Sequence, residues 1–75
     1  MEAMQQRTGV VKFFNDVEGW GIIFDEELGD VHVHWKAVPG EPGTKNLQRN
    51  DIVLYVPGKR KDGYFALKVI SFTRS

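Results

Sequence analysis

WGIIFDEELGDVHVHW, residues 20–35, is the segment that says most about the fold. Two runs rich in β-branched and aromatic residues, 20–24 and 31–35, flank an acidic, glycine-containing turn at 25–29. Two such runs joined by a short loop with glycine are typical of a β-hairpin. In the second run valine and histidine alternate, which is the period of a strand with one buried face. The segment therefore predicts a hairpin whose second strand has a valine face and a histidine face.

Three further strands are expected around this hairpin. TGVVKFF (8–14) precedes it, and IVLYV (52–56) and YFALKVISF (64–72) follow it. Five short strands in a chain of 75 residues need closure, because open sheet edges invite aggregation. We therefore predict an all-β fold, a five-stranded antiparallel barrel of the OB type, whose second and third strands form a nucleic-acid-binding face.

The connections between the strands are predicted from their glycine, proline and charged residues. Two Pro-Gly pairs indicate a loop over 38–50, and 57–63 reads as a basic turn. Residues 36–38 are expected to form no more than one 3₁₀ turn. A flexible N-terminus is expected over residues 1–6, followed by one domain over residues 7–75.

The period-two rule assigns the side chains of the hairpin to two faces. The two valines of the histidine-valine run belong to the core, and Ile23 is assigned to the core with them. Pairing in a hairpin puts the outward residues of both strands on one sheet face. The outer face is therefore expected to carry Trp20, Ile22, His32 and His34, with Phe13 and Trp35 at its margins.

An alternative assignment, with Trp20, Ile22 and Phe24 all inside, stays open, because a tryptophan among apolar residues is usually in the core. The glycines on both sides of Trp20 favour the outer face. Glycine in a strand often marks the close approach of a ligand or of another backbone. An exposed aromatic face would suit single-stranded nucleic acid, since stacking on an aromatic ring is worth roughly 1–3 kcal/mol per base.

The net charge of the chain argues mildly against nucleic-acid binding. Ten Lys and Arg residues balance ten Asp and Glu residues, whereas nucleic-acid binders are typically basic. The nine aromatic residues point the other way. The one basic cluster, 59–61, is expected either to take phosphates beside the face or to be a solvated hairpin tip. The acidic turn over 25–27 is expected to be a solvated loop.

Other classes of site find little support. His32 and His34 share a strand face with Asp30, but zinc usually needs four ligands and the chain has no cysteine, so no metal or cofactor is expected. No nucleophile–base pair or phosphate-cradling loop is apparent, so an enzyme is not expected. We expect a soluble, cytoplasmic protein with no membrane segment and no small-molecule substrate. A monomer is the default, with a dimer possible.

Several motifs resemble those of the cold-shock domain family. TGVVKFFN (8–15) and GWGII (19–23) resemble its first signature, and DVHVHW (30–35) resembles its second. KAV (36–38) and ALKV (66–69) are similar to later motifs, so the resemblance covers about residues 7–72. It implies a five-stranded OB-like barrel that binds single-stranded RNA or DNA, with little sequence preference, and acts as an RNA chaperone or as a regulator of transcription or translation.

The resemblance also implies roles for single residues. Phe13, Trp20 and Trp35 match stacking aromatics, and His34 matches a histidine of the same surface. Lys12 matches a phosphate-facing lysine. Asp30 matches an aspartate that accepts hydrogen bonds from a base edge. The full set of expected nucleic-acid-binding residues is Lys12, Phe13, Trp20, Ile22, Asp30, His32, His34, Trp35, Arg60 and Lys61.

Three departures from the family pattern indicate weaker, stacking-led binding. Ile22 and His32 each replace an aromatic residue, and Glu18 stands where a lysine is usual. These changes and the zero net charge leave a second function open. The same barrel face would then serve as a protein-interaction module, with weak or no nucleic-acid binding.

Overall fold

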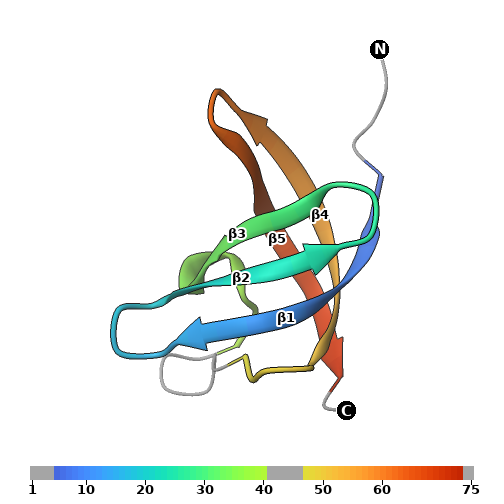
Figure 1. Ribbon diagram of the computed structural model, residues 1–75. Coiled ribbons are helices and arrows are strands. Elements are labelled where there is room, and N and C mark those ends of the chain that lie inside the picture. The colour runs from blue at the N-terminus through green and yellow to red at the C-terminus, as the bar shows by residue number, and fades with distance from the viewer. Residues whose placement is uncertain (1–4, 41–46, 74–75) are drawn as a thin grey trace.

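The computed structural model describes residues 5–40 and 47–73. Five strands close into a barrel in the order β1-β2-β3-β5-β4 (Figure 1). This arrangement confirms the predicted all-β, five-stranded OB-type fold. No helix among the described residues is long and apolar enough to span a membrane. The elements are β1 (Arg7–Asn15), β2 (Trp20–Asp25), β3 (Gly29–His34), the 3₁₀ turn η1 (Trp35–Ala37), β4 (Ile52–Arg60) and β5 (Gly63–Thr73).

One pair of neighbouring strands is parallel, so the prediction of a purely antiparallel barrel was wrong. The pairs β1–β2, β2–β3, β1–β4 and β4–β5 are antiparallel, whereas β3 and β5 run parallel. The cause is geometric, because an odd number of strands cannot alternate in direction all the way around a closed ring. The parallel contact brings His32 of β3 beside Phe65 of β5.

Some boundaries differ from those predicted. The third strand ends at His34, and Trp35 already belongs to the 3₁₀ turn. The expected basic turn over 57–63 was wrong in extent, since β4 continues to Arg60. Pro57 lies next to a register shift in the β4–β5 ladder, where a residue without an N–H is tolerated.

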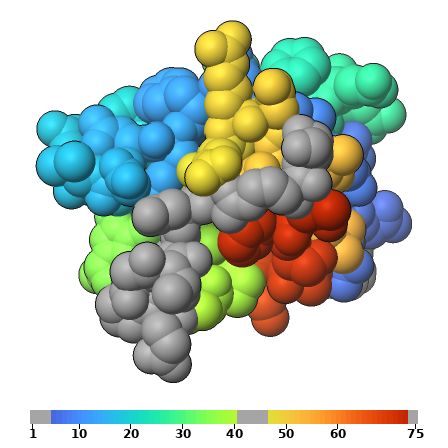
Figure 2. Space-filling model, turned by 90° about the horizontal axis from the view of Figure 1, so that it is seen from below, coloured from blue at the N-terminus to red at the C-terminus, as the bar shows by residue number. Residues whose placement is uncertain are grey.

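Parts of two predictions fall outside the described residues. They are residues 1–4 of the expected flexible N-terminus and residues 41–46 of the expected loop. The first strand, β1, begins at Arg7. Figure 2, seen from below, shows residues 47–52 in yellow beside β1 in blue. There the Val11 N–H donates to the Asp51 carbonyl over 2.9 Å.

The core is built from inward-facing residues of all five strands, together with Val38 and Leu47 from the connection between η1 and β4. Ile23, Val31 and Val33 have no exposed surface, which confirms their assignment to the core. Trp20 and Ile22 are half-buried on the other side of the sheet, and Phe24 is exposed there. The alternative in which Trp20, Ile22 and Phe24 all pack inside is therefore wrong.

Asp25 is the exception to the expected solvated acidic turn. Its side chain is fully buried, and the Arg7 guanidinium donates to both of its carboxylate oxygens over 2.6 and 3.0 Å. The Tyr55 hydroxyl donates to Oδ2 over 2.7 Å, and the backbone N–H groups of Glu27 and Leu28 donate to Oδ1. The buried carboxylate thus ties β1, β2, β4 and the β2–β3 turn together.

The same contacts shift the protonation of this cluster. The Arg7 guanidinium, and more weakly the Tyr55 hydroxyl, hold the pKa of Asp25 well below its usual range, although burial alone would raise it. Burial, and then the hydrogen bond to Asp25, raise the pKa of Tyr55. The cluster is therefore a structural ion pair with a neutral tyrosine near neutral pH.

Candidate nucleic-acid interface

A β-bulge at Lys12 turns Phe13 onto the outer face of the barrel. Under a strict period of two, Phe13 would share the inward face of Val11, which is 1% exposed. The register instead shifts between these two residues, with Val11 opposite Ile23 and Phe13 opposite Ile22. One extra residue in a strand reverses the alternation beyond it. Phe13 is therefore 43% exposed, on the outer side of β1.

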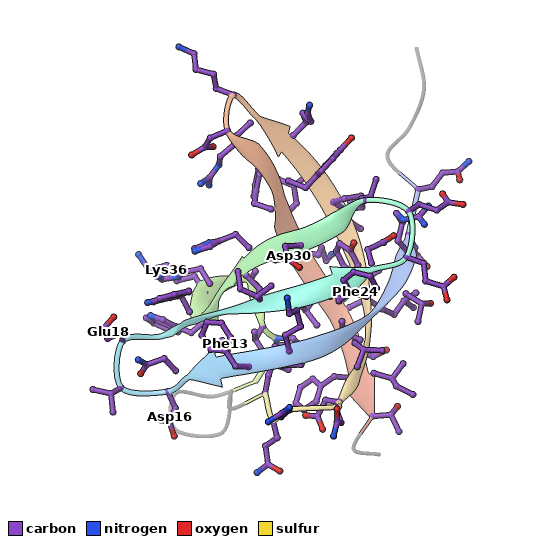
Figure 3. All side chains as sticks on the ribbon, in the orientation of Figure 1. Phe13, Asp16, Glu18, Phe24, Asp30 and Lys36 are labelled. Atoms are coloured by element: carbon purple, nitrogen blue, oxygen red, sulfur yellow. The ribbon has the colours of Figure 1, made fainter. Side chains whose placement is uncertain are left out.

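Four side chains then form a continuous surface across β1, β2 and β3. Phe13 lies opposite Ile22, and Ile22 opposite His32. The Trp20 indole meets the Phe13 ring edge-on, with centroids 5.3 Å apart, and stacks nearly parallel to the His32 imidazole at 5.2 Å. We call Phe13, Trp20, Ile22 and His32 the stacking face. Figure 3 shows Phe13 on this side of the sheet, with Phe24 and Asp30 farther along it.

Glu18 fixes the orientation of the central indole. The Trp20 Nε1–H donates to Glu18 Oε1 over 3.0 Å. The turn that carries Glu18 is held by Asn15, whose Oδ1 accepts the N–H groups of Val17 and Glu18 over 3.0 Å each. The acid that occupies the usual lysine position therefore has a positioning contact, although its charge faces the same surface.

We expect Glu18→Gln to raise the affinity for single-stranded oligonucleotides a few-fold. Glutamine keeps an acceptor oxygen for the indole N–H but removes a negative charge near the bound phosphates, and one such interaction is worth about 1 kcal/mol or less at an exposed site. Fluorescence anisotropy of a labelled oligonucleotide measures the change. Asp16→Asn, in the same turn, is the matched control (Figure 3). Equal gains in both variants would show that Glu18 has no particular place on the binding path.

The glycines beside Trp20 admit other parts of the same chain. A Cβ at Gly19 would overlap the Trp35 ring, and one at Gly21 would overlap the β1 backbone. The backbone of Gly19 has a positive φ of 82° and accepts the Trp35 N–H at 2.8 Å. Gly19 therefore lets Trp35 pack against the β1–β2 turn, beside the stacking face, and Gly21 lets β1 approach β2 closely.

His34 and Trp35 continue the surface at this end. Their rings are 5.9 Å apart and tilted by 32°, and Trp35 is 36% exposed. The His34 Nδ1 accepts the Lys36 backbone N–H over 3.2 Å. A neutral ring with an accepting Nδ1 carries its proton on Nε2, so His34 presents a donor to the surroundings.

The polar pair Lys12 and Asp30 lies at the opposite edge. The Lys12 Nζ is 3.2 Å from the Asp30 carboxylate, and both side chains are more than half exposed. An exposed pair of this kind is worth about 0–1 kcal/mol, so a ligand can open it easily. Once opened, the pair offers a cation to a phosphate and an acceptor to a base amino group.

The two cations predicted on the β4–β5 hairpin lie in different places. Arg60, the last residue of β4, has its guanidinium carbon 4.0 Å from the centroid of the Phe65 ring, and it lines a hollow with His32 and His34. Lys61 is exposed in the turn at the hairpin tip. The described contacts thus bring Arg60, but not Lys61, to the stacking face.

Phe24 and Phe65, two aromatics that pair with residues of this surface, were missing from the sequence-based list. Phe24 is 44% exposed and lies opposite Asp30 and Val10. Phe65 lies opposite His32 in the parallel pair. Period two could have identified Phe24, which has the parity of Trp20. Identifying Phe65 would have required knowledge of the strand order.

Across the part of the chain that the structure describes, no group of three or more His, Cys, Asp and Glu side chains could hold a metal ion. The two histidines are engaged otherwise. His32 stacks on Trp20, and the Nδ1 of His34 accepts a backbone N–H.

A closed five-stranded barrel with exposed aromatic rings on β1, β2 and β3 defines an OB-type nucleic-acid-binding barrel. The model of the 'Cold-shock' DNA-binding domain matches residues 7–72. The chain therefore belongs to the cold-shock domain family, as its sequence motifs indicated, and its function is nucleic-acid binding. Membership does not favour the alternative of a protein-interaction module.

Curated relatives agree with this assignment. The cold shock protein CapB of Pseudomonas syringae is 34% identical over 64 residues, which cover 85% of this chain and 91% of that protein. The major cold shock protein of Micrococcus luteus is 39% identical over 67 residues, covering 88% and 94%. The cold shock-like protein CspLB of Listeria monocytogenes is 43% identical over 56 residues, covering 72% and 83%.

Proposed function

We propose that the protein binds single-stranded RNA or DNA by stacking bases on Phe13, Trp20 and His32. In this proposal it keeps its targets unpaired, as an RNA chaperone or as a regulator of transcription or translation in the cytoplasm. The observation that carries the proposal is the mutual arrangement of these three rings on neighbouring strands. A duplex hides its base faces, so a surface of this kind selects single strands.

The remaining site residues supply orientation and charge. Trp35 extends the stacking surface beyond His34, whose Nε2–H is available to a base or phosphate. Ile22 provides apolar contact between stacked rings. When nucleic acid binds, the ion pair between Lys12 and Asp30 opens. Lys12 then contacts a phosphate, and Asp30 accepts a hydrogen bond from a base edge.

Charge has a smaller part here than in a basic binding protein. Among the described cations, Lys12 pairs with Asp30, Arg60 lies over the Phe65 ring, and Lys36 lines one hollow together with Arg60. For single strands, log K falls with log salt by about 0.7 per neutralised phosphate. Two or three contacts predict a slope of about −1.4 to −2.1.

Titration with a short oligothymidine tests the proposal through the intrinsic fluorescence of Trp20 and Trp35. We expect quenching at micromolar protein in low salt, with a midpoint that weakens only modestly between about 50 and about 200 mM salt. A duplex of the same length should quench far less. Absence of quenching by any single-stranded oligonucleotide at low salt would contradict the proposed function and would favour a protein partner for this face.

A further inference from the structure

The row of residues across the stacking face does not stop at β3. Phe13 lies opposite Ile22, Ile22 opposite His32, and His32 opposite Phe65. Neighbouring strands are about 4.8 Å apart, so this row spans roughly 14 Å across four strands. The parallel β3–β5 contact therefore adds a fourth position, with an aromatic residue, to a row that already carries the proposed binding residues.

Phe65 is held in place by the opposite strand. A Cβ at Gly58 would overlap the Phe65 ring, so the ring lies directly over the backbone of β4 at its pairing partner. The Arg60 guanidinium lies 4.0 Å from the ring centroid. A guanidinium plane next to an aromatic ring offers a second flat surface, and bases stack on arginine planes as they do on aromatic rings.

Two hollows flank this pair, and both have His32, Arg60 and Phe65 in their walls. The hollow of about 370 Å³ reaches His34 and Lys36, and that of about 260 Å³ reaches Ile22 and Asp30. Arg60 and Phe65 thus lie between two recesses that are continuous with the stacking face. Each recess also holds a polar side chain that can meet a phosphate or a base edge.

We propose that Phe65 and Arg60 form an additional nucleotide-binding position, which continues the path of a single strand from the stacking face across His32 onto β5. One base stacks on the flat surface that Phe65 and Arg60 make, and the guanidinium neutralises an adjacent phosphate. This inference rests on the proposed function, because it extends the same bound strand. Continuity with His32 and the positive charge of Arg60 favour nucleic acid as the occupant.

A tryptophan reporter tests the position directly. Phe65→Trp is placed in a background of Trp20→Phe and Trp35→Phe, so that the only indole lies on β5. An oligonucleotide of about eight nucleotides, within the site sizes known for OB folds, is titrated while anisotropy of its label records binding. We expect quenching of the introduced indole in step with binding.

An affinity measurement complements the reporter. Phe65→Ala is expected to weaken binding of the same oligonucleotide roughly 5- to 50-fold, as for the loss of one stacked base. The control is Ile52→Ala, which truncates an exposed apolar side chain at the start of β4. This variant should bind with unchanged affinity. An unquenched indole, or unchanged affinity in Phe65→Ala, overturns the position on β5 while the wild type still binds. A wild type that binds no single strand overturns the proposed function and this extension together.

Discussion

Trp20→Ala is expected to lower the affinity for single-stranded oligonucleotides roughly 10- to 100-fold while the barrel stays folded. Loss of one stacked base accounts for about 1–3 kcal/mol, and each 1.4 kcal/mol is a factor of ten. The indole also contacts the Phe13 and His32 rings, so its removal frees two further rings of the stacking face. Anisotropy with a labelled oligonucleotide measures the loss, and circular dichroism monitors the fold.

Two variants make this result interpretable. Trp20→Phe keeps a stacking ring and should lose much less affinity. Val17→Ala changes a side chain that is 92% exposed at the tip of the β1–β2 turn, and it should bind as the wild type does. An unfolded Trp20→Ala protein would instead show that the indole supports the barrel, and wild-type affinity would remove it from the binding path.

Asp25→Asn is expected to destabilise the protein by about 2–4 kcal/mol. The substitution leaves an acceptor for the turn N–H groups but removes the charge that pairs with Arg7, and it weakens a buried network that includes the Tyr55 hydroxyl. Since a domain of this size has only a few kcal/mol of net stability, most of it would be lost. At about 4–8 °C per kcal/mol, Tm should fall by roughly 8–32 °C.

The same carboxylate predicts how stability depends on pH. Because the folded-state pKa of Asp25 is depressed, its contribution is complete above the ordinary carboxyl pKa and is lost as the pH falls below it towards the folded value. Thermal unfolding followed between about pH 6 and pH 2 should show this loss in the wild type and a smaller one in Asp25→Asn. Asp16→Asn, at an exposed position, is the control. Parallel pH profiles for wild type and Asp25→Asn would contradict the role of the cluster.

Strand periodicity predicted those parts of the site that depend on one regular hairpin. The alternation of valine and histidine in β3 placed Val31 and Val33 inside and His32 outside, and its pairing with β2 placed Ile23 inside. Register in a hairpin is fixed when one face is buried, so these assignments needed no tertiary information. The position of Trp20 on the outer face follows from the same alternation.

Features that depend on irregularity or on strand order could not be derived this way. The bulge at Lys12 reverses the parity of Phe13, so strict alternation does not explain why this ring lies on the outer face, where we expected it at the margin and where the resemblance to cold-shock domains gave it a stacking role. Phe65 joins the row because β5 lies next to β3 in the barrel, with His32 opposite Phe65. The burial of Asp25 required its partners Arg7 and Tyr55, which are 18 and 30 residues away in the chain. An acidic turn gives no local sign of such partners.

A map of backbone amide chemical shifts, recorded by NMR while a single-stranded oligonucleotide is added, tests the proposed binding surface most directly. We expect the largest changes at the residues of the stacking face and at its neighbours on β3 and β5. Residues around Ile52 at the start of β4, away from the row that runs from Phe13 to Phe65, should change little. Changes centred on the start of β4 around Ile52, or no changes at saturating oligonucleotide, would contradict binding through this face. The residues expected to respond are Lys12, Phe13, Trp20, Ile22, Asp30, His32, His34, Trp35, Arg60 and Phe65.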